Sequence, residues 1–227
     1  MTYRPITDVW LLARAKLTDG HKLYGAFLGG FGERARALLG VQIDDPVLHV
    51  CAGRVRNYPY KRAVGPNDRT LDLDPAMEPD FLQDARLPYP TGFRAILADP
   101  PYSEIDAAKY APGAEAYPSP NLIARLAIDA LPVGGRVGIL HYAWAAPPAN
   151  AIEVAAIAVG TGRNGRARWF IVLEKLGAER RHGGSGTARR KLRREEDALA
   201  LRLAEETADM VAELAEAAAA AEGVVDG

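Results

Sequence analysis

The string Ile96-Leu-Ala-Asp99-Pro100-Pro101-Tyr102 holds the residues of this chain that are best suited to chemistry. An apolar run ends at the acid Asp99. Two prolines then fix the backbone and donate no N–H, so the carbonyls of the turn are held outward. An amino group on a planar heterocycle needs such a set, because Asp99 and the Pro100 carbonyl can accept its two N–H bonds while Tyr102 stacks on the ring.

The alternation of apolar segments predicts the elements that position this turn. Short runs of Val, Ile and Leu alternate with segments of helical spacing, which is typical of a parallel sheet covered by helices. Two later runs, 152–159 and 167–173, leave no room for a crossover helix and predict an antiparallel hairpin. We therefore expect an α/β fold with a mostly parallel sheet that ends in a hairpin. The other expected strands lie near 7–13, 46–51, 69–73, 94–98 and 136–141, and the expected helices cover 31–39 and 120–131.

The tetrapeptide at 99–102 resembles the catalytic motif of DNA amino-methyltransferases, which methylate N6 of adenine or N4 of cytosine with S-adenosylmethionine. The resemblance spans about residues 7–175 and implies a Rossmann-like class I methyltransferase fold with a seven-stranded sheet. It also implies that Asp99, Pro100, Pro101 and Tyr102 form the catalytic loop. The short distance from the preceding Gly loop to this motif resembles compact phage or prophage-type adenine methyltransferases.

That Gly loop is the segment Val47-Leu-His-Val-Cys-Ala-Gly53, which resembles the first cofactor strand of the family and implies cofactor contacts of His49, Cys51 and Gly53. The family's loop reads acid-x-x-x-Gly-x-Gly, whereas this chain has His49 for the acid and Val55 for the second glycine. Two alternatives stay open. His49 can be a packed or hydrogen-bonded strand-end histidine, and Cys51 can fill the core as a small hydrophobe.

Further acids and one aromatic residue complete the implied cofactor site. Asp72 resembles the acid that accepts the ribose hydroxyls, while Asp74 competes for that role or caps the following turn. Asp84 resembles the acid of the stretch that meets the cofactor adenine. Phe27 resembles the aromatic residue of the segment that closes over the methionine part of the cofactor.

The formal net charge of −1 conceals a segregation of charge along the chain. Residues 161–194 carry 11 Lys and Arg against 2 Asp and Glu, while residues 195–227 carry 1 against 10. Such a basic stretch predicts contact with a polyanion, and the resemblance makes DNA the expected partner. Arg163, Arg166 and Arg168 on the hairpin are the candidate phosphate contacts. A solvated surface neutralised by the acidic tail is the alternative.

The composition changes sharply after residue 177. Three glycines within 178–187 predict a flexible linker between a methyltransferase domain over 1–177 and a charged helix and tail over 188–227. Residues 188–222 contain no Pro or Gly and many Ala, Leu, Glu and Arg, which predicts a long helix. Its interrupted apolar stripe predicts packing on the domain, on a second copy in a homodimer or on another partner.

Several classes of protein are excluded by composition. The single cysteine cannot form an intramolecular disulfide, and no window approaches the roughly 20 apolar residues that cross a bilayer. We therefore expect a cytoplasmic protein without membrane contact. The four histidines lack the spacing of zinc ligands, so no metal is expected. Residues 103–120 are expected to form a mobile loop over the target base, and His141 and Tyr142 to wall the same pocket.

The expected activity is methyl transfer from S-adenosylmethionine to an exocyclic amino group of a DNA base, with adenine N6 as the first choice. An RNA base or a protein glutamine amide offers the same kind of nitrogen. Glutamine enzymes resemble an Asn-Pro-Pro-Tyr form, which disfavours that branch for Asp99. A third alternative is a catalytically reduced nucleic-acid-binding or assembly subunit, which would bind no cofactor.

Overall fold

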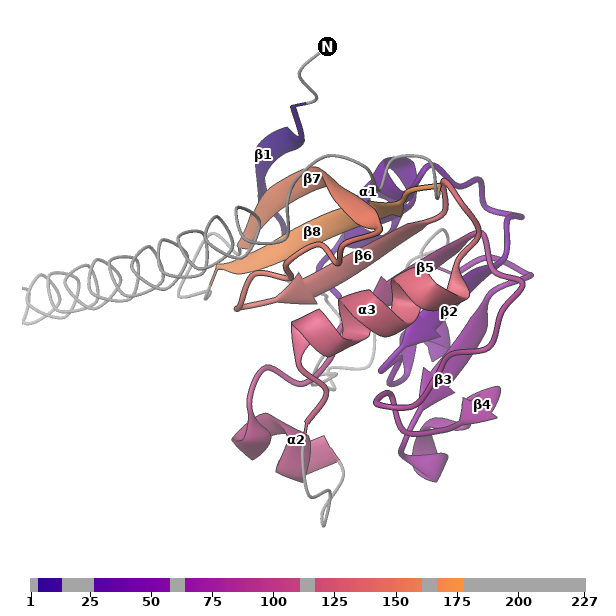
Figure 1. Ribbon diagram of the computed structural model, residues 1–227. Coiled ribbons are helices and arrows are strands. Elements are labelled where there is room, and N and C mark those ends of the chain that lie inside the picture. Colours follow the sequence, from indigo (N-terminus) through magenta and orange to yellow (C-terminus); the bar gives the residue numbers. More distant parts are fainter. Residues whose placement is uncertain (1–3, 14–26, 58–63, 111–116, 161–166, 178–227) are drawn as a thin grey trace, which may run out of the picture. The chain divides into compact units, whose positions relative to one another are not determined.

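The computed structural model describes residues 4–13, 27–57, 64–110, 117–160 and 167–177 (Figure 1). The chain divides into two units, Met1–Arg181 and His182–Gly227, and every described residue belongs to the first. The predicted linker over 178–187 and the predicted helix over 188–222 therefore lie outside the described residues and stay predictions.

A mixed sheet of eight strands forms the centre of the described part of the chain, in the order β1-β7-β8-β6-β5-β2-β3-β4. The chain runs outward from β2 through β3 to β4 and then returns to β5 on the other side of β2, so the strand order reverses between β2 and β5. Open α/β sheets bind ligands beyond the carboxyl ends of the strands at such a reversal. The strands are β1 (Ile6–Leu11), β2 (Val47–Val50), β3 (Arg69–Asp72), β4 (Phe81–Leu82), β5 (Ala95–Ala98), β6 (Arg136–His141), β7 (Ala151–Gly160) and β8 (Arg168–Lys175).

Strand β8 pairs antiparallel with both β6 and β7, and the other neighbouring strands in the sheet pair in parallel. The expected α/β class, a mostly parallel Rossmann-like sheet with an antiparallel hairpin, is confirmed. The seven predicted strands gain an eighth, the two-residue β4, which is too short to show a periodicity. Because β8 runs antiparallel, its first residue lies at the edge of the sheet where the parallel strands end.

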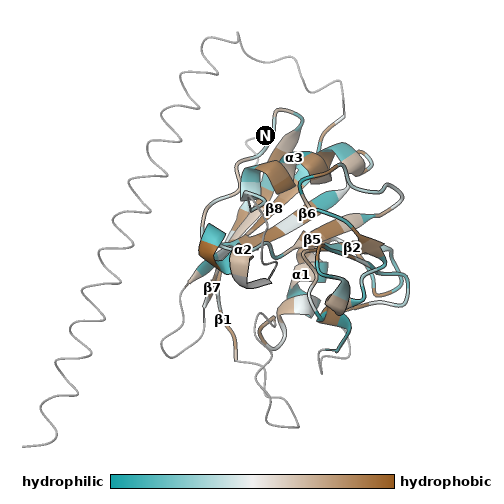
Figure 2. Cartoon of the chain, turned by 90° about the horizontal axis from the view of Figure 1, so that it is seen from below, coloured by the Kyte–Doolittle hydropathy of each residue, from teal (hydrophilic) through white to brown (hydrophobic). Residues whose placement is uncertain are grey.

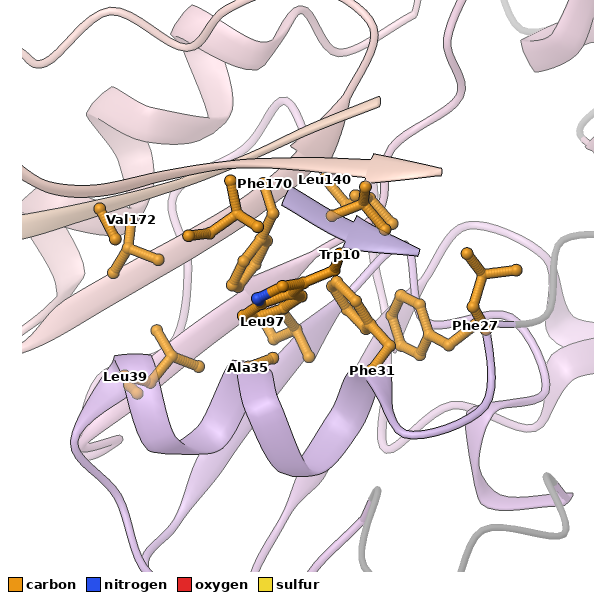
Figure 3. Close-up of a cluster of buried hydrophobic side chains, with 14 of the residues drawn as sticks. Trp10, Phe27, Phe31, Ala35, Leu39, Leu97, Leu140, Phe170 and Val172 are labelled. Carbon is orange, nitrogen blue, oxygen red and sulfur yellow. The ribbon is translucent and has the colours of Figure 1, made fainter. Parts of the chain in front are cut away.

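Helix α1 (Phe31–Leu39) covers one face of the sheet, where Figure 3 shows aromatic rings gathered between the helix and the strands. The ring centroid of Phe31 lies 5.0 Å from that of Phe170 on β8 and 6.2 Å from that of Trp10 on β1. A Cβ added to Gly138 on β6 would lie 2.6 Å from the Phe170 ring. The packing of these rings therefore requires glycine at position 138.

Helix α3 (Pro120–Ala130) contributes to a second core, made with β2, β5 and β6 (Figure 1). Ser119 caps its N-terminus, since the Ser119 hydroxyl accepts a hydrogen bond from the Leu122 N–H at 3.3 Å. Ile123, Ala127 and Ile128 of this helix are fully buried. In Figure 2 both α1 and α3 carry hydrophilic as well as hydrophobic residues, as expected for helices with one face on a sheet.

Helix α2 (Glu104–Tyr110) begins two residues after Tyr102, so part of the loop expected over 103–120 is helical. The Ser103 hydroxyl accepts a hydrogen bond from the Asp106 N–H at 3.1 Å and so supports the start of this helix. Two short 3-10 helices, η1 (Val55–Asn57) and η2 (Pro75–Met77), follow β2 and β3. In the described ranges, no helix is long and apolar enough to cross a membrane.

Candidate active site

The carboxyl ends of β2, β3 and β5 meet at one edge of the sheet and bring the predicted acids to it. The Asp99 N–H, directly after β5, donates to the Val50 carbonyl of β2 at 3.3 Å. The Ala52 N–H, in the turn after β2, donates to the Leu71 carbonyl of β3 at 3.3 Å. Each bond fixes a turn to the end of the neighbouring strand, at the place where open α/β sheets bind their ligands.

Two side chains of the turn after β5 and one from the start of β8 are hydrogen-bonded in series at this edge. The Tyr102 hydroxyl donates to Asp99 Oδ1 at 2.7 Å and accepts a hydrogen bond from Arg168 Nη1 at 2.7 Å. The guanidinium carbon of Arg168 also lies 5.8 Å from the centre of the Tyr102 ring, within the range of a cation–π interaction. We call Asp99, Tyr102 and Arg168 together the Tyr102 clasp.

The end of β6 supplies two further residues beside the clasp. The Tyr102 ring centroid lies 4.5 Å from that of Tyr142 and 5.4 Å from that of His141. Burial lowers the pKa of His141, against a smaller opposite effect of the backbone at Pro101 and Ala143. His141 is therefore neutral at pH 7 and adds no positive charge beside Tyr102.

Asp99 is partly buried, and burial raises its pKa from the ordinary 3.8 to about 6, even though the positive charge of Arg168 and the Tyr102 hydroxyl lower it. The carboxylate is therefore charged at pH 7 at a cost in free energy. Burial also raises the pKa of Tyr102, and the charge of Asp99 adds to this rise, so the hydroxyl stays protonated. None of the described residues donates to Asp99 Oδ2, and Pro100 next to it is buried.

The turn after β2 is built on two residues with left-handed backbone, Cys51 with φ 53° and Gly53 with φ 49°. The Gly53 N–H donates to Asp72 Oδ2 at 2.8 Å. A Cβ added at Gly53 would meet no atom within 4 Å. The structure thus brings Gly53 and Asp72 together beside open space, which a ligand could approach closely because glycine has no side chain.

Asp72 and Asp74 have different partners, which separates the two candidates for the ribose contact. Besides Gly53, Asp72 accepts a hydrogen bond from the Asp74 N–H at 3.0 Å. Asp74 accepts one from the Ala76 N–H at 2.9 Å and caps η2. Asp74 is therefore the cap of the following turn, and Asp72 is the acid that joins the Gly loop.

Cys51 lies among three of the acids at this edge. Burial raises the pKa of its thiol, and the charges of Asp72, Asp99 and Asp84 raise it further. The thiol is half-buried and packs against the core on the α3 side, as the alternative of a small core hydrophobe describes. Asp72 at the end of β3, Asp84 after β4 and Asp99 after β5 therefore all lie close enough to act on Cys51.

Asp84 is paired with a neighbouring arginine. Its Oδ2 accepts from Arg86 Nη2 at 2.6 Å and from Arg86 Nε at 2.9 Å. These hydrogen bonds hold the pKa of Asp84 below its ordinary value, against the effect of burial. Asp84 is thus fixed as a carboxylate at this edge, and Arg86 balances its charge.

His49 faces away from this edge, toward the core on the α1 side. It is 2% exposed, and its Nε2 lies 2.9 Å from Asp68 Oδ2. Asp68 also accepts a hydrogen bond from the Gly65 N–H at 2.8 Å and forms a buried ion pair with Arg36 of α1. This geometry fits the hydrogen-bonded strand-end histidine, and we assign His49 no part in binding a cofactor.

Arg36 and Asp68 were not identified from the sequence. Arg36 follows Ala35 on the buried side of α1 and is 6% exposed. An arginine at an apolar position of a helix is a signal that a buried acid must pair with it. Asp68 precedes β3 in a turn and has no pattern of its own to distinguish it.

Phe27 lies in the core next to α1, in the same cluster of buried side chains as Ala52 and Val55 of the turn after β2. It is 7% exposed, and its ring centroid lies 4.9 Å from that of Phe31 (Figure 3). Its expected contact with the methionine part of a cofactor stays a prediction.

Arg168 is the one predicted phosphate contact within the described residues, since Arg163 and Arg166 lie outside them. It is half-buried and hydrogen-bonded to Tyr102, and its contact with phosphates stays a prediction. The contact joins residues 66 positions apart, which no local spacing could reveal. Among the residues that the structure describes, no group of three or more His, Cys, Asp or Glu could hold a metal ion.

Comparisons with known proteins give similar folds at low similarity. No family model matches the chain, and no curated protein does. TrmN from Thermus thermophilus is 24% identical with a TM-score of 0.47 over 64% of this chain and 48% of TrmN, so the chain spans about half the length of TrmN. An rRNA methylase from Streptococcus thermophilus is 12% identical with a TM-score of 0.41, over 67% of this chain and 100% of that one. SMU.1697c from Streptococcus mutans, solved in complex with SAH, is 11% identical with a TM-score of 0.41, over 63% and 97%. Similarity at this level assigns no activity, substrate or family to the chain.

Proposed function

We propose that the chain transfers a methyl group from S-adenosylmethionine to an exocyclic amino group of a nucleic-acid base, with adenine N6 of DNA as the target. The observation that carries this proposal is the position of Asp99. Its carboxylate follows β5 at the strand-order reversal, and Oδ2 has no donor among the described residues. The turn after β2, whose Gly53 N–H donates to Asp72 at the end of β3, lies at the same edge. An acceptor for N–H groups beside a turn open to a ligand is the arrangement that such a transfer needs.

The residues after β2 and β3 fit S-adenosylmethionine. Asp72 can accept hydrogen bonds from ribose hydroxyls, as acids do in dinucleotide-binding folds. The open space at Gly53 allows the backbone to approach a ligand. The Asp72 carboxylate, which accepts hydrogen bonds from two backbone N–H groups, favours a positively charged sulfonium. When bound, S-adenosylmethionine supplies an electrophilic methyl group.

Asp99 and the Pro100 carbonyl are the proposed acceptors for the two N–H bonds of the target amino group. The lone pair of such a nitrogen is delocalised into the ring. Accepting both hydrogens favours a more pyramidal and more nucleophilic nitrogen as positive charge develops on it. Asp99, with a pKa of about 6, is also suited to take up the proton that the methylated nitrogen loses.

The rings beside Asp99 supply the proposed stacking surface for the target base. Tyr102 and Tyr142 lie 4.5 Å apart between centroids. A base in duplex DNA has to be flipped out of the stack, at a cost of a few kcal/mol, and stacking on Tyr102 offsets part of it. The preference for DNA rests on the basic stretch over 161–194, which an RNA backbone could also contact.

Product analysis tests this proposal. The full chain is incubated with S-adenosylmethionine and with single-stranded DNA, duplex DNA or RNA, and the nucleic acid is digested and analysed by mass spectrometry for methylated nucleosides. We expect N6-methyladenine from DNA. If N6-methyladenine forms in RNA and not in DNA, the substrate is RNA. If none of the three nucleic acids is methylated and calorimetry detects no binding of S-adenosylmethionine, the proposed methyl transfer is wrong. The alternative of a catalytically reduced nucleic-acid-binding or assembly subunit would then hold.

A further inference from the structure

The Tyr102 clasp connects the start of β8 to the turn after β5 through one hydroxyl. That hydroxyl uses its hydrogen on Asp99 and a lone pair on Arg168, with both bonds at 2.7 Å. A hydroxyl that accepts a hydrogen bond from a cation becomes a stronger donor in its other bond. Arg168 therefore strengthens the bond that Tyr102 makes to Asp99 Oδ1.

The titratable groups around Asp99 belong to β8, to its own turn, to the turn after β2 and to the end of β6. Arg168 of β8 is positive, and Tyr102 of the same turn is a neutral donor. From the turn after β2 comes the protonated Cys51, and beyond it lie Asp72 and Asp84.

At the end of β6, His141 is neutral because burial lowers its pKa, and Tyr142 lies beside Tyr102. Arg168 is thus the cation that acts on Asp99 within the described part of the chain.

We infer that Arg168 is a positioning residue for the proposed methyl transfer, which holds Tyr102 through its hydroxyl and keeps Asp99 Oδ2 available as a charged acceptor. This inference rests on the proposed function. Tyr102 occupies Oδ1, so the amino group of the base approaches the other oxygen. The same bonds fix the Tyr102 ring, on which the base stacks, relative to that oxygen.

The two effects of Arg168 have different dependence on pH. Loss of its charge raises the pKa of Asp99, so the carboxylate is protonated at a higher pH and the acid limb of the activity moves upward. Loss of its hydrogen bond frees the Tyr102 ring, which lowers turnover at every pH. A role limited to folding would move neither the limb nor the carboxyl titration.

The test compares Arg168→Gln, Arg168→Lys and Tyr102→Phe with the wild type in the full chain. Arg125→Gln is the matched control, because Arg125 is exposed on α3 and removes the same charge away from the site. The pKa of Asp99 is measured by NMR of ¹³C-labelled aspartate, with Asp99→Asn to assign the signal. The pH profiles of kcat and KM for methyl transfer are recorded in parallel, and melting temperatures report folding.

We expect Arg168→Gln and Tyr102→Phe to raise the pKa of Asp99 above about 6, by about one pH unit for Arg168→Gln, with the same displacement of the acid limb. Arg168→Gln also lowers kcat about tenfold at pH 8.5, where Asp99 is ionised, with little change in the KM for S-adenosylmethionine. Arg168→Lys restores much of the carboxyl pKa and less of kcat.

Each opposite result identifies what fails. An Asp99 pKa in Arg168→Gln equal to that in Arg125→Gln would overturn the inference while leaving the proposed function intact. The expected rise in pKa with a wild type that methylates neither DNA nor RNA would overturn the proposed function, and with it any part of Arg168 in methylation.

Discussion

Asp99 is held in a position that favours its proposed task over the stability of the fold. Burial raises its pKa from 3.8 to about 6, so the folded chain binds the proton of this carboxyl more tightly than the unfolded chain does. The free energy of unfolding therefore falls as the pH rises from about 4 to about 7 and Asp99 ionises. A buried carboxylate retained despite this cost is a feature of functional sites.

We predict that Asp99→Asn stabilises the protein at pH 7.5, by about 1 to 3 kcal/mol, because the amide keeps the shape of the carboxyl without its charge. The gain disappears below about pH 3, where Asp99 is protonated in both the folded and the unfolded state. Urea unfolding at the two pH values measures it, with the exposed Asp129→Asn on α3 as the control. A variant less stable than the wild type at pH 7.5 would contradict the account of Asp99.

A second residue-scale prediction concerns the cofactor contact. Asp72→Ala removes the carboxylate at the Gly loop and is expected to weaken binding of S-adenosylmethionine about tenfold or more, as the loss of a hydrogen bond to a charged group does. Asp74→Ala removes the cap of η2 and leaves that affinity nearly unchanged. Calorimetric titration of both variants decides between them. A larger loss for Asp74→Ala would reverse the assignment.

The buried ion pair of Arg36 and Asp68 connects α1 to the turn before β3. Asp68 forms an ion pair with Arg36 of α1 and a hydrogen bond with His49 of β2. It also accepts a hydrogen bond from the Gly65 N–H. Although burial acts to raise the pKa of Asp68, the hydrogen bonds from His49 and Arg36 outweigh it and lower that pKa. The charged acid therefore stabilises the fold at neutral pH, and this contribution is lost as the pH falls through the lowered pKa.

We predict that Asp68→Asn lowers the free energy of unfolding by about 3 kcal/mol at pH 7, because it leaves the buried Arg36 without its counter-charge. Thermal unfolding followed by circular dichroism measures the loss. The difference from the wild type should shrink toward pH 3. A loss under about 1 kcal/mol at pH 7 would mean that the pair contributes little.

The elements with strong periodicity were the ones that the sequence allowed us to predict. Helix α1 has its predicted bounds, and α3 ends one residue earlier than predicted, because their apolar faces and terminal Gly or Pro residues are local signals. Strand β4 has two residues and α2 has seven, too few for a period to emerge. The bond from Arg168 to Tyr102 depends on the antiparallel pairing of β8, a tertiary fact.

Across the whole molecule, the basic stretch over 161–194 lies only partly within the described residues. Of the basic residues over 161–194, the structure describes Arg168 and Lys175. Arg168 is bonded to Tyr102, and Lys175 Nζ donates to the carbonyls of Asp129 and Leu131 at the end of α3. Both cations are engaged in hydrogen bonds within the domain. The proposed contact with phosphates therefore depends on the other basic residues of this stretch.

We predict that replacing both Arg163 and Arg166 by Ala reduces the slope of log Kd against log salt concentration for DNA by about 1 to 2, as expected for the loss of two phosphate contacts. Arg168→Ala should leave that slope unchanged, because its charge is already engaged in the site. Fluorescence anisotropy at several salt concentrations measures both. A smaller slope of log Kd against log salt concentration in Arg168→Ala alone would show that Arg168 contacts a phosphate.

We propose that Asp99 accepts a hydrogen bond from the amino group whose nitrogen is methylated. Transfer of labelled methyl from S-adenosylmethionine to DNA and RNA, compared between the wild type, Asp99→Ala and the control Asp129→Ala, tests it most directly. We predict transfer by the wild type and the control, and a loss of about a hundredfold or more in Asp99→Ala, with cofactor binding retained. Methyl transfer at the wild-type rate in Asp99→Ala would show that Asp99 does not accept the amino group.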